Sequence, residues 1–404
     1  MAISGRIRLA LLAIIGLAAS PALAGNTVVM TDSNRAAALA ALQPGDTLQL
    51  QGDFTTILSL ANRDFGGVRV QAQGANLLQG LKLENVQNIA FSGGTYGSST
   101  TNTREYWGVM LNDVTNVSLT GATIAGTGTN SRGGMRVSGA SFLTIRDNDI
   151  KGVRMGVQVG GATDSLIANN HFTELSEDGL RVISSNRVIV AENSCTNFTP
   201  HATAHPDCIQ MWTGTSTVQA GGPVQSDIYL LNNTAIGAMQ AFVSFDPRSY
   251  SGERMTFAGN YAAVSYPHGV SCYGCRNSLI QDNVLVTLPE AEWETIIRIP
   301  DAVNVVRDNN PRFDLRPLAG TGDYVLPDRI WSFLTPSIAG QVGSSLTAQT
   351  WNSRIVPLEA EQIGGFAGAG SVPEPATWLL LALGFALVGR ALRDNRGGPR
   401  HALA

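Results

Sequence analysis

The chain has 404 residues, of which 44% are hydrophobic and 14% are charged. Its 27 Lys and Arg residues are outnumbered by 31 Asp and Glu residues, and no basic block is present. This composition excludes a disordered chain, which would be poor in apolar residues, and a nucleic-acid-binding protein, which would need clustered positive charge. Because the balance is acidic, an anionic substrate would have to be held by a local group of arginines.

Residues 1–24 have the features of a secretory signal peptide. Arg6 and Arg8 form the basic start, residues 9–17 form the apolar core, and Ala22-Leu23-Ala24 supplies small residues for cleavage. The sequence therefore predicts export. Residues 25–47 then predict an N-terminal cap, in which residues 35–42 form a short helix that shields the end of a stack of strands.

A repeated phrase runs through residues 48–310, in which alternating apolar residues are followed by an Asn. The Asn residues that close the phrase are Asn148, Asn170, Asn193, Asn233, Asn260, Asn283 and Asn309. A repeat of 20–30 residues with two short strands in each period predicts an all-β solenoid, a parallel β-helix. We expect the Asn residues to adopt the left-handed conformation and to form an internal ladder, each amide bonding to the rungs above and below.

A second strand phrase, in phase with the first, aligns two columns of side chains along the predicted solenoid. The first column is Trp107, Gly133, Met155, Asp178, Asp207, Gln240 and His268. The second column, predicted to point outward, is Met110, Arg136, Gln158, Arg181, Gln210, Val243, Ser271 and Arg298. Because neighbouring rungs lie ~4.8 Å apart, Asp178 and Asp207 are predicted to face each other.

One period is longer than a coil needs. Asn193 and Asn233 are 40 residues apart, and the extra length flanks residues 201–212 and includes a Thr- and Gly-rich loop at residues 213–222. Loops that grow from a rigid scaffold often carry function, so this coil is the predicted position of a site.

The residues around this coil suit proton chemistry on a charged sugar. Two carboxylates at this spacing cannot both ionise freely, so one becomes available as a general acid or base. An arginine can bind the carboxylate of a uronic acid and acidify its C5 proton for removal by a histidine. The predicted catalytic residues are Asp178, Asp207, His205 and Arg181. The predicted substrate-binding residues are Arg136, Gln158, Gln210, Trp212, His201 and His268.

A purely structural interpretation competes with this hypothesis. Asp178 and Asp207 would then be turn residues at the start of a strand, the histidines exposed loop residues and the arginines exposed ladder charges. The functional interpretation is favoured because the acid pair, a histidine and Trp212 coincide at the irregular coil. A Ca²⁺ ion held by the two aspartates and loop acids is considered as a cofactor, although no ligand spacing supports it.

Four cysteines in an exported chain favour disulfides over metal binding. Cys272 with Cys275 would close a tight turn, and Cys195 with Cys208 would join neighbouring coils, although the spacing does not fix the connectivity. A redox role for the Cys-x-x-Cys sequence lacks the surrounding βαβ pattern of thioredoxin-like proteins.

The C-terminal region contains three predicted parts. Periodicity fades in residues 311–363, which predicts a C-terminal cap, and residues 364–371 predict a Gly-rich linker. Residues 372–404 contain Val372-Pro373-Glu374-Pro375, an apolar run at 376–389 and four arginines. This segment resembles the PEP-CTERM sorting tail of Gram-negative bacteria.

That resemblance implies processing by the export machinery and by an exosortase-like transpeptidase. The apolar run is shorter than the ~20 residues that span a bilayer comfortably, which fits a short transmembrane segment acting as a transient inner-membrane anchor. Cleavage near Pro-Glu-Pro would release the protein to the cell surface or the extracellular matrix. An ordinary C-terminal membrane anchor is the alternative.

The repeats resemble the right-handed parallel β-helix superfamily, which includes pectate lyases, polygalacturonases, alginate lyases and alginate C5-epimerases. The resemblance implies a polysaccharide partner, but the nearest pieces of a polygalacturonase signature are Pro267-His268-Gly269 and Arg298-Ile299-Pro300, which are incomplete. We expect a monomeric lyase or epimerase of uronic-acid polymers. A polysaccharide hydrolase and a non-catalytic glycan-binding matrix protein are the alternatives, so the sequence favours an enzyme without deciding it.

Overall fold

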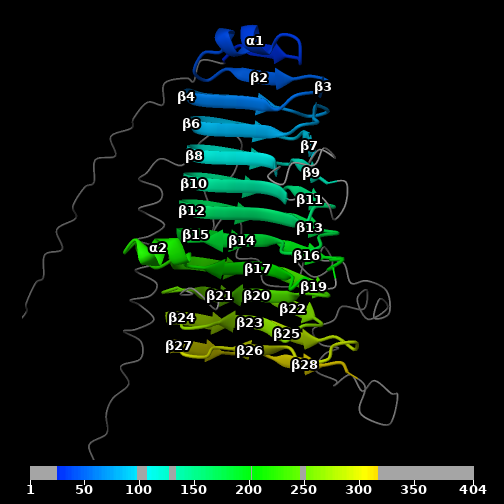
Figure 1. Cartoon of the computed structure of the whole chain (residues 1–404), viewed down its shortest axis with the longest axis vertical. Helices are drawn as coiled ribbons and strands as arrows, with labels where there is room; N and C mark the ends of the chain where they lie inside the picture. Colours follow the sequence, from blue (N-terminus) through cyan, green and yellow to red (C-terminus); the bar gives the residue numbers. More distant parts are fainter. Residues whose placement is uncertain (1–24, 98–106, 127–132, 202, 246–251, 317–404) are drawn as a thin grey trace, which may run out of the picture.

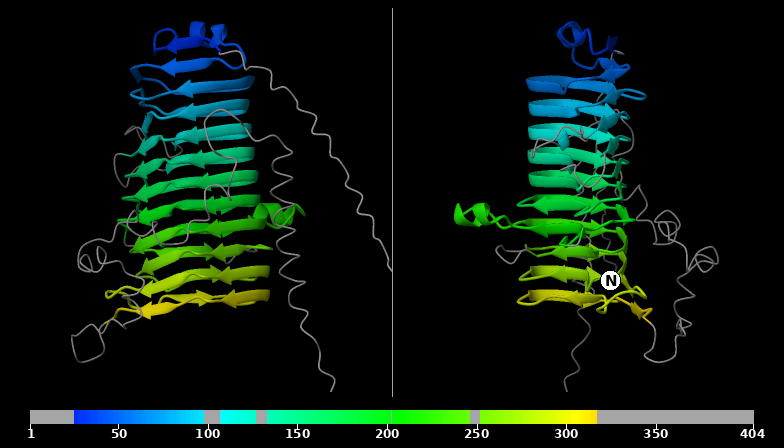
Figure 2. Two further views of the ribbon diagram at one scale, coloured as in Figure 1. Left: turned by 180° about the vertical axis from the view of Figure 1, so that it is seen from behind. Right: turned by 45° about the vertical axis from the view of Figure 1, so that its right-hand side comes forward.

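The protein is a parallel β-helix whose coils stack along one long axis (Figures 1 and 2). The computed structural model describes residues 25–97, 107–126, 133–201, 203–245 and 252–316. At the N-terminal end, helix α1 (Arg35–Ala41) lies beside β1 (Thr27–Met30) and β2 (Thr47–Leu50). The predicted fold class is confirmed, and the predicted helix at 35–42 is present.

The first coils each contain one long strand that bends midway. These long strands are β4 (Leu58–Gln71), β6 (Leu81–Ser92), β8 (Trp107–Thr120), β10 (Gly133–Arg146) and β12 (Met155–Ala168). From residue 180 onward the bend separates each long strand into a first and a second segment. The pairs are β14 (Leu180–Ile183) and β15 (Asn186–Ala191), β17 (Asp207–Trp212) and β18 (Ser226–Leu231), β20 (Gln240–Ser244) and β21 (Thr256–Ala258), β23 (His268–Cys272) and β24 (Arg276–Gln281), and β26 (Ile296–Arg298) and β27 (Val303–Asp308).

A third segment completes each coil, whereas the sequence predicted two strands per period. These short strands form their own parallel sheet. They are β3 (Asp53–Phe54), β5 (Asn76–Leu77), β7 (Thr95–Gly97), β9 (Thr123–Ala125), β11 (Asp149–Lys151), β13 (His171–Thr173), β16 (Ser194–Thr196), β19 (Thr234–Gly237), β22 (Tyr261–Val264), β25 (Val284–Thr287) and β28 (Arg312–Asp314). Segments of two to four residues are too short to show an alternating pattern of their own.

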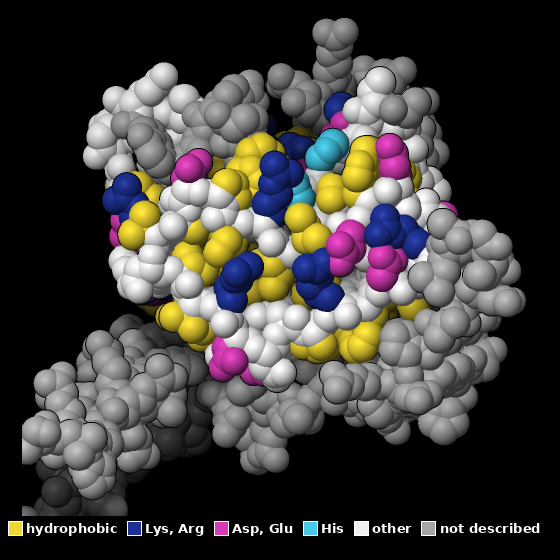
Figure 3. Space-filling view, turned by 90° about the horizontal axis from the view of Figure 1, so that it is seen from below, with side chains coloured by type: hydrophobic (Ala, Val, Ile, Leu, Met, Phe, Trp, Pro, Cys, Tyr) yellow, Lys and Arg dark blue, Asp and Glu magenta, His cyan; other side chains and the backbone are white. Residues whose placement is uncertain are grey.

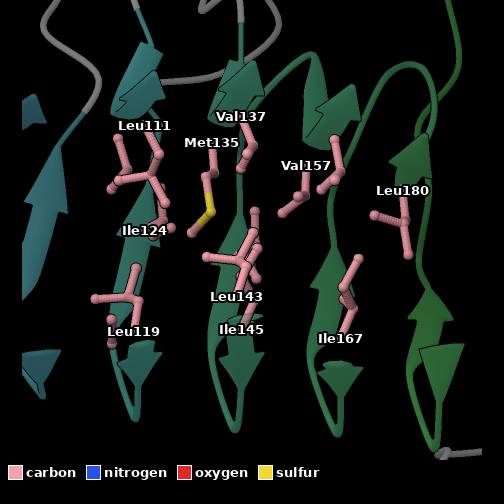
Figure 4. Packing of buried hydrophobic residues seen from close by; sticks show 14 of the residues in the cluster. Leu111, Leu119, Ile124, Met135, Val137, Leu143, Ile145, Val157, Ile167 and Leu180 are labelled. Atoms are coloured by element: carbon pink, nitrogen blue, oxygen red, sulfur yellow. The ribbon is translucent and has the colours of Figure 1, made fainter. Parts of the chain in front are cut away.

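A continuous apolar core fills the solenoid from one end to the other. One cluster of buried side chains extends from Met30 to Ile280. Figure 4 shows how it forms: Met135, Val157 and Leu180 come from successive coils in register and point into the same interior. Each fully buried side chain of this size contributes about 1.5–3 kcal/mol, so the stack needs no second domain to bury its apolar faces.

A buried ladder of Asn side chains joins the coils between the second and third segments. Asn193 accepts hydrogen bonds at Oδ1 from the backbone N (3.0 Å) and Nδ2 (2.9 Å) of Asn170. Its own Nδ2 donates to Oδ1 of Asn233 (3.0 Å) and to the carbonyl oxygen of Ile167 (2.9 Å). Every amide in the middle of the ladder therefore bonds in both directions along the axis, as predicted.

Two details of the predicted ladder were wrong. The left-handed conformation is taken by the residue before each ladder Asn, such as Glu192 (φ 57°), and not by the ladder Asn itself. For the same reason the last rung is Asn310 and not Asn309. Asn309 is left-handed (φ 47°), and Oδ1 of Asn310 accepts from Nδ2 of Asn283 at 2.8 Å.

The C-terminal end of the described stack exposes apolar side chains. Figure 3 views this end, where hydrophobic side chains are spread among basic ones. Val303 and Val306 on β27 are 57% and 55% exposed. Strand β28 lies at the start of the predicted C-terminal cap, and the rest of that cap from residue 317, the linker and the sorting tail lie outside the described residues. Within the described ranges, no helix has the length and hydrophobicity that a membrane crossing requires.

Replacing a central ladder residue should destabilise the protein strongly. Asn193→Ala would leave several buried polar groups unpaired, so we expect the free energy of unfolding to fall by about 3–4 kcal/mol. Asn310→Ala is the matched control, because water reaches the half-buried last rung, and its loss should be less than half as large. Chemical denaturation measures both, and equal losses would contradict the ladder's role.

Candidate functional site

The register of the first segments confirms the two predicted columns. In the outward column Arg136 pairs with Gln158, Gln158 with Arg181, and Arg181 with Gln210. The same column continues through Val243, Ser271 and Arg298. In the other column Asp207 pairs with Gln240, and His268 follows one rung later. The predicted binding residues Arg136, Gln158 and Gln210 therefore lie on one face with Arg181.

Asp178 and Asp207 meet across one rung, as predicted, but they lie behind the surface. Each residue is only 2% exposed. Oδ2 of Asp178 accepts a hydrogen bond from Nε of Arg181, and Oδ1 accepts from the backbone N of Asp207 at 2.9 Å. The member of this cluster that reaches the outer face is Arg181, whose guanidinium lies 5.9 Å from the ring centroid of Trp212.

Burial sets the protonation of the aspartate pair. Burial and the negative charge of Asp178 raise the pKa of Asp207 well above its ordinary value. Burial also raises the pKa of Asp178, while Arg181 and the N–H of Asp207 oppose the rise. Asp207 is therefore the member of the pair whose protonated form is favoured most, while Arg181 favours the charged form of Asp178.

The predicted histidines are held by other groups. Both ring nitrogens of His205 face Nε2 of Gln240 on the next rung, and its ring meets that of Tyr266 edge-on at 6.0 Å. His201 is exposed, with Nε2 3.4 Å from Glu177 Oε1, which also pairs with Arg154. The ring of His205 thus faces the rung after Asp207, and its role as the base that removes the C5 proton stays a prediction.

His268 belongs to a second polar cluster on the same face. Its Nε2 lies 3.3 Å from the hydroxyl of Tyr273, and the residue is only 7% exposed. The ring of Tyr273 packs on Phe245 at 4.4 Å and lies 5.5 Å from the guanidinium carbon of Arg298. Burial and the nearby charges of Arg298 and His205 lower the pKa of His268 to about 4, so its ring is neutral at neutral pH.

Consecutive residues of the buried column contain polar atoms without a partner among the described residues. They are Oδ1 of Asp207, Oε1 of Gln240 and Nδ1 of His268. Each such atom costs about 1–3 kcal/mol, and buried polar groups in native proteins are nearly always paired. Their position on three successive rungs makes this column a candidate for contact with a bound molecule.

Sequence reasoning aligned Gln240 and Arg298 in the columns but assigned neither of them a role, and it missed Tyr273 entirely. The columns contained a signal for Gln240 and Arg298, because Gln240 follows Asp207 in the first column and Arg298 ends the outward column. Tyr273 gave none, since it follows the strand in an irregular turn.

Each disulfide lies next to one of the two polar clusters, that of Asp178 and Asp207 or that of His268 and Tyr273. Cys195 is bonded to Cys208, the residue after Asp207, and Cys272 is bonded to Cys275 around the turn that contains Tyr273. The pairs match those considered from the sequence, and in this structure the Cys-x-x-Cys cysteines are bonded to each other.

The insertion in the long coil is not only a loop. Residues 215–219 form helix α2 (Thr215–Gln219), which stands away from the stack (Figure 2). The hydroxyls of Ser184 and Thr217 are 2.8 Å apart and connect the insertion to the coil before it. The insertion follows Trp212 directly, so it borders the polar face.

In the described part of the chain, no three His, Cys, Asp or Glu side chains are arranged to hold a metal ion. The Ca²⁺ hypothesis stays untested.

Comparison with known proteins identifies the fold. A family model described as "Right handed beta helix region" matches residues 66–288, more than half of the chain. The chain belongs to this right-handed β-helix family. A second model, the PEP-CTERM protein-sorting motif, matches residues 371–396 of this β-helix protein. That motif indicates exosortase-dependent sorting to the cell surface of a Gram-negative bacterium. No curated protein matches the chain.

Solved structures show the same fold at low identity. PfbA, a surface adhesin of Streptococcus pneumoniae, is 10% identical with a TM-score of 0.52, over 75% of this chain and 90% of PfbA. The Dettilon tailspike protein is 15% identical with a TM-score of 0.53, and the match covers 73% of this chain and 64% of the tailspike. An alginate lyase from Paenibacillus is 13% identical over 72% of this chain and 98% of the lyase, with a TM-score of 0.40. The likeness to PfbA and to the tailspike shows a shared fold and nothing about activity.

Loop length should decide how much each disulfide stabilises the β-helix. The Cys195–Cys208 bond spans 13 residues and the Cys272–Cys275 bond spans 3. We expect replacement of both Cys195 and Cys208 by Ala to cost about 3 kcal/mol of unfolding free energy, and replacement of Cys272 and Cys275 by Ala to cost less. Denaturant titrations of the two double variants test this order, and a reversed order would contradict it.

The lowered pKa of His268 should make stability depend on pH. The unfolded chain binds the proton near pH 6.5 and the folded chain only near pH 4, so His268 costs the protein stability as the pH falls between these values. Titratable or charged groups facing the ring are Tyr273, Arg298 and His205. We expect the stability of the wild type relative to His268→Gln to decrease from pH 7 to pH 4. A constant difference would show that the folded-state pKa is ordinary.

Proposed function

We propose that this protein acts on a uronic-acid polysaccharide at the cell surface, as a lyase or an epimerase. One observation supports this most: an outward column containing Arg136 and Arg181 runs beside buried groups whose pKa values are shifted from their ordinary range. The arginines offer carboxylate binding along the axis of a rigid stack. Shifted pKa values such as those of Asp207 and His268 are typical of sites that move protons.

The arginine column suits a charged polymer better than a small molecule. Arg136 is exposed and forms no ion pair with another described residue. The hydrogen bond from Nε to Asp178 fixes the direction of Arg181, whose guanidinium lies beside Trp212. Arginine binds carboxylates with charge-assisted, directional hydrogen bonds, and an aromatic ring beside it can stack on a sugar. In this proposal Asp178 positions Arg181, and Arg181 binds a uronate.

Elimination and epimerisation both begin with removal of the C5 proton of a uronate. The reaction needs a cation that neutralises the carboxylate, a neutral base and a proton donor. The polar face provides arginines, a neutral histidine (His268) and the protonated phenol of Tyr273. The predicted direct catalytic role of Asp178, Asp207 and His205 is retained as part of the proposal to be tested.

Two other functions make different use of the same features. A hydrolase would use the aspartate pair directly, because a carboxyl group with a raised pKa suits protonation of a glycosidic oxygen. A binding protein would use the exposed arginines of the outward column to hold the polymer without chemical change. The assay below separates these alternatives.

The first test is incubation of the purified protein with alginate, polygalacturonate and neutral dextran, with and without Ca²⁺. A lyase produces unsaturated ends that absorb ultraviolet light, and an epimerase changes the proton spectrum of the polymer without cleaving it. Reducing ends without absorbance would indicate a hydrolase. Binding without any chemical change on the whole panel would contradict the enzyme proposal.

Arg181 should matter for charged substrates. We expect Arg181→Ala to lower kcat/KM on the active uronate polymer by about 10- to 100-fold, because one charge-assisted interaction contributes about 1.5–3 kcal/mol. Arg276→Ala is the matched control, since Arg276 is an exposed arginine on β24, which belongs to the second segments of the coils. Equal activity of the two variants would exclude Arg181 from substrate binding.

A further inference from the structure

The cluster of His268, Tyr273 and Arg298 is a compact set of groups that the sequence did not assemble. The three residues come from two successive coils: His268 begins β23, Tyr273 follows that strand, and Arg298 ends β26 in register with Ser271. Nε2 of His268 forms a hydrogen bond with the Tyr273 hydroxyl. The guanidinium of Arg298 lies over the ring of the same tyrosine. The Cys272–Cys275 disulfide closes the turn that holds Tyr273.

Each group has the protonation state that the reaction requires at neutral pH. His268 is neutral, because burial and the charges of Arg298 and His205 disfavour its cation. Burial raises the pKa of Tyr273, with Arg298 opposing the rise, so the phenol retains its proton. Arg298 is exposed and cationic, and it is the member of the cluster that is most accessible to a polymer.

We propose that His268, Tyr273 and Arg298 form the proton-transfer site at which a uronate residue reacts, with Arg298 on its carboxylate, His268 as base and Tyr273 as acid. This inference rests on the proposed function and names the residues that perform it.

The elimination balances with these groups alone. The bound sugar first replaces the contact between the Tyr273 hydroxyl and Nε2 of His268, so that the hydroxyl turns to the glycosidic oxygen. Nε2 of His268 then takes the C5 proton, and the electron pair of that C–H bond forms the C4–C5 double bond. The C4–O bond to the neighbouring sugar breaks, and its oxygen takes the phenolic proton of Tyr273. The proton on His268 then returns to Tyr273, directly or through solvent, which restores both groups. An epimerase would use the same first step and return a proton to the opposite face of C5.

Substrate binding would itself make His268 a better base. The charge of Arg298 is one cause of the lowered pKa of His268, and a bound carboxylate offsets that charge. The base therefore gains proton affinity when the uronate is in place. The weak basicity of the free protein does not argue against the assignment.

The position of this cluster relative to Arg181 suits one extended chain. Arg181 and Arg298 belong to the same outward column and are separated by four rungs. At ~4.8 Å for each rung this is roughly 19 Å along the axis, which several linked sugars would bridge. Arg181 would then bind the polymer away from the reacting sugar.

The test compares Tyr273→Phe and His268→Gln with wild type on the uronate polymer that the wild type converts, assayed in D₂O. We expect Tyr273→Phe to lose cleavage by about 100-fold or more, with KM nearly unchanged, because the acid is gone. It should still exchange deuterium into C5, since His268 remains. His268→Gln should lose both cleavage and exchange. Tyr229→Phe on β18 is the control and should behave as wild type.

Arg298 supplies a second, conservative check. Arg298→Lys keeps the charge but not the planar fork, so we expect a partial loss that Arg298→Ala makes complete. Far-ultraviolet circular dichroism and the thermal midpoint establish that each variant is folded. If His268→Gln unfolds, the variants of the partly exposed Tyr273 and the exposed Arg298 still test the proposal.

The outcomes separate this inference from the function on which it rests. Full activity of folded Tyr273→Phe and Arg298→Ala, with an active wild type, would overturn the site and leave the uronate function standing. A wild type inactive on both alginate and polygalacturonate, with and without Ca²⁺, would overturn both. Loss of cleavage with retained exchange in Tyr273→Phe alone would establish the division of roles.

Discussion

The buried Asn ladder is the constraint on which the rest of the structure depends. Backbone pairing alone would let a coil slip along its neighbour, because a parallel strand offers the same hydrogen bonds in more than one register. A side-chain amide that bonds to the coil before and the coil after permits one register only. The hydrogen bonds from Asn170 to Asn193 and from Asn193 to Asn233 hold this register across the 40-residue period, where an insertion would otherwise be most disruptive. The insertion is accommodated outside the ladder as helix α2.

The fixed register aligns equivalent residues of successive coils on one face of the solenoid. Residues at one position of the repeat become a column, so Arg136, Arg181 and Arg298 form a line although more than 160 residues separate the first from the last. A column on a rigid stack needs no further ordering to meet an extended ligand, which lowers the entropic cost of binding. The disulfides next to Asp207 and around Tyr273 add local constraint at the two places where ionisable groups are buried.

Sequence reasoning reached the fold and the alignment of the columns because both follow from periodicity. The repeated spacing of the Asn residues defined the coils, and the position before each strand defined Asp178 opposite Asp207. Sequence reasoning failed where the structure depends on one particular residue or on a contact between distant residues. Asn309 and Asn310 are adjacent, and only the backbone turn shows which one is the rung. Alignment also could not show that the aspartates are buried behind Arg181.

Tyr273 illustrates the remaining gap. Its approach to His268 results from a turn closed by a disulfide, and Arg298 reaches it from another coil. Tyr273, unlike Tyr229 and Tyr261, lies between two cysteines, but that spacing does not show which side chains its ring meets. The proposed site in this repeat protein thus depends on residues that depart from the repeat. Periodicity alone cannot show which of these residues matter.

A crystal structure of the protein with a uronic-acid hexamer would test the central claim most directly. The account predicts that the oligosaccharide lies along the axis over β14, β17, β20, β23 and β26, with carboxylates at Arg181 and Arg298 and a sugar ring next to His268. An oligosaccharide bound over the second or third segments, or lying across the axis, would contradict it.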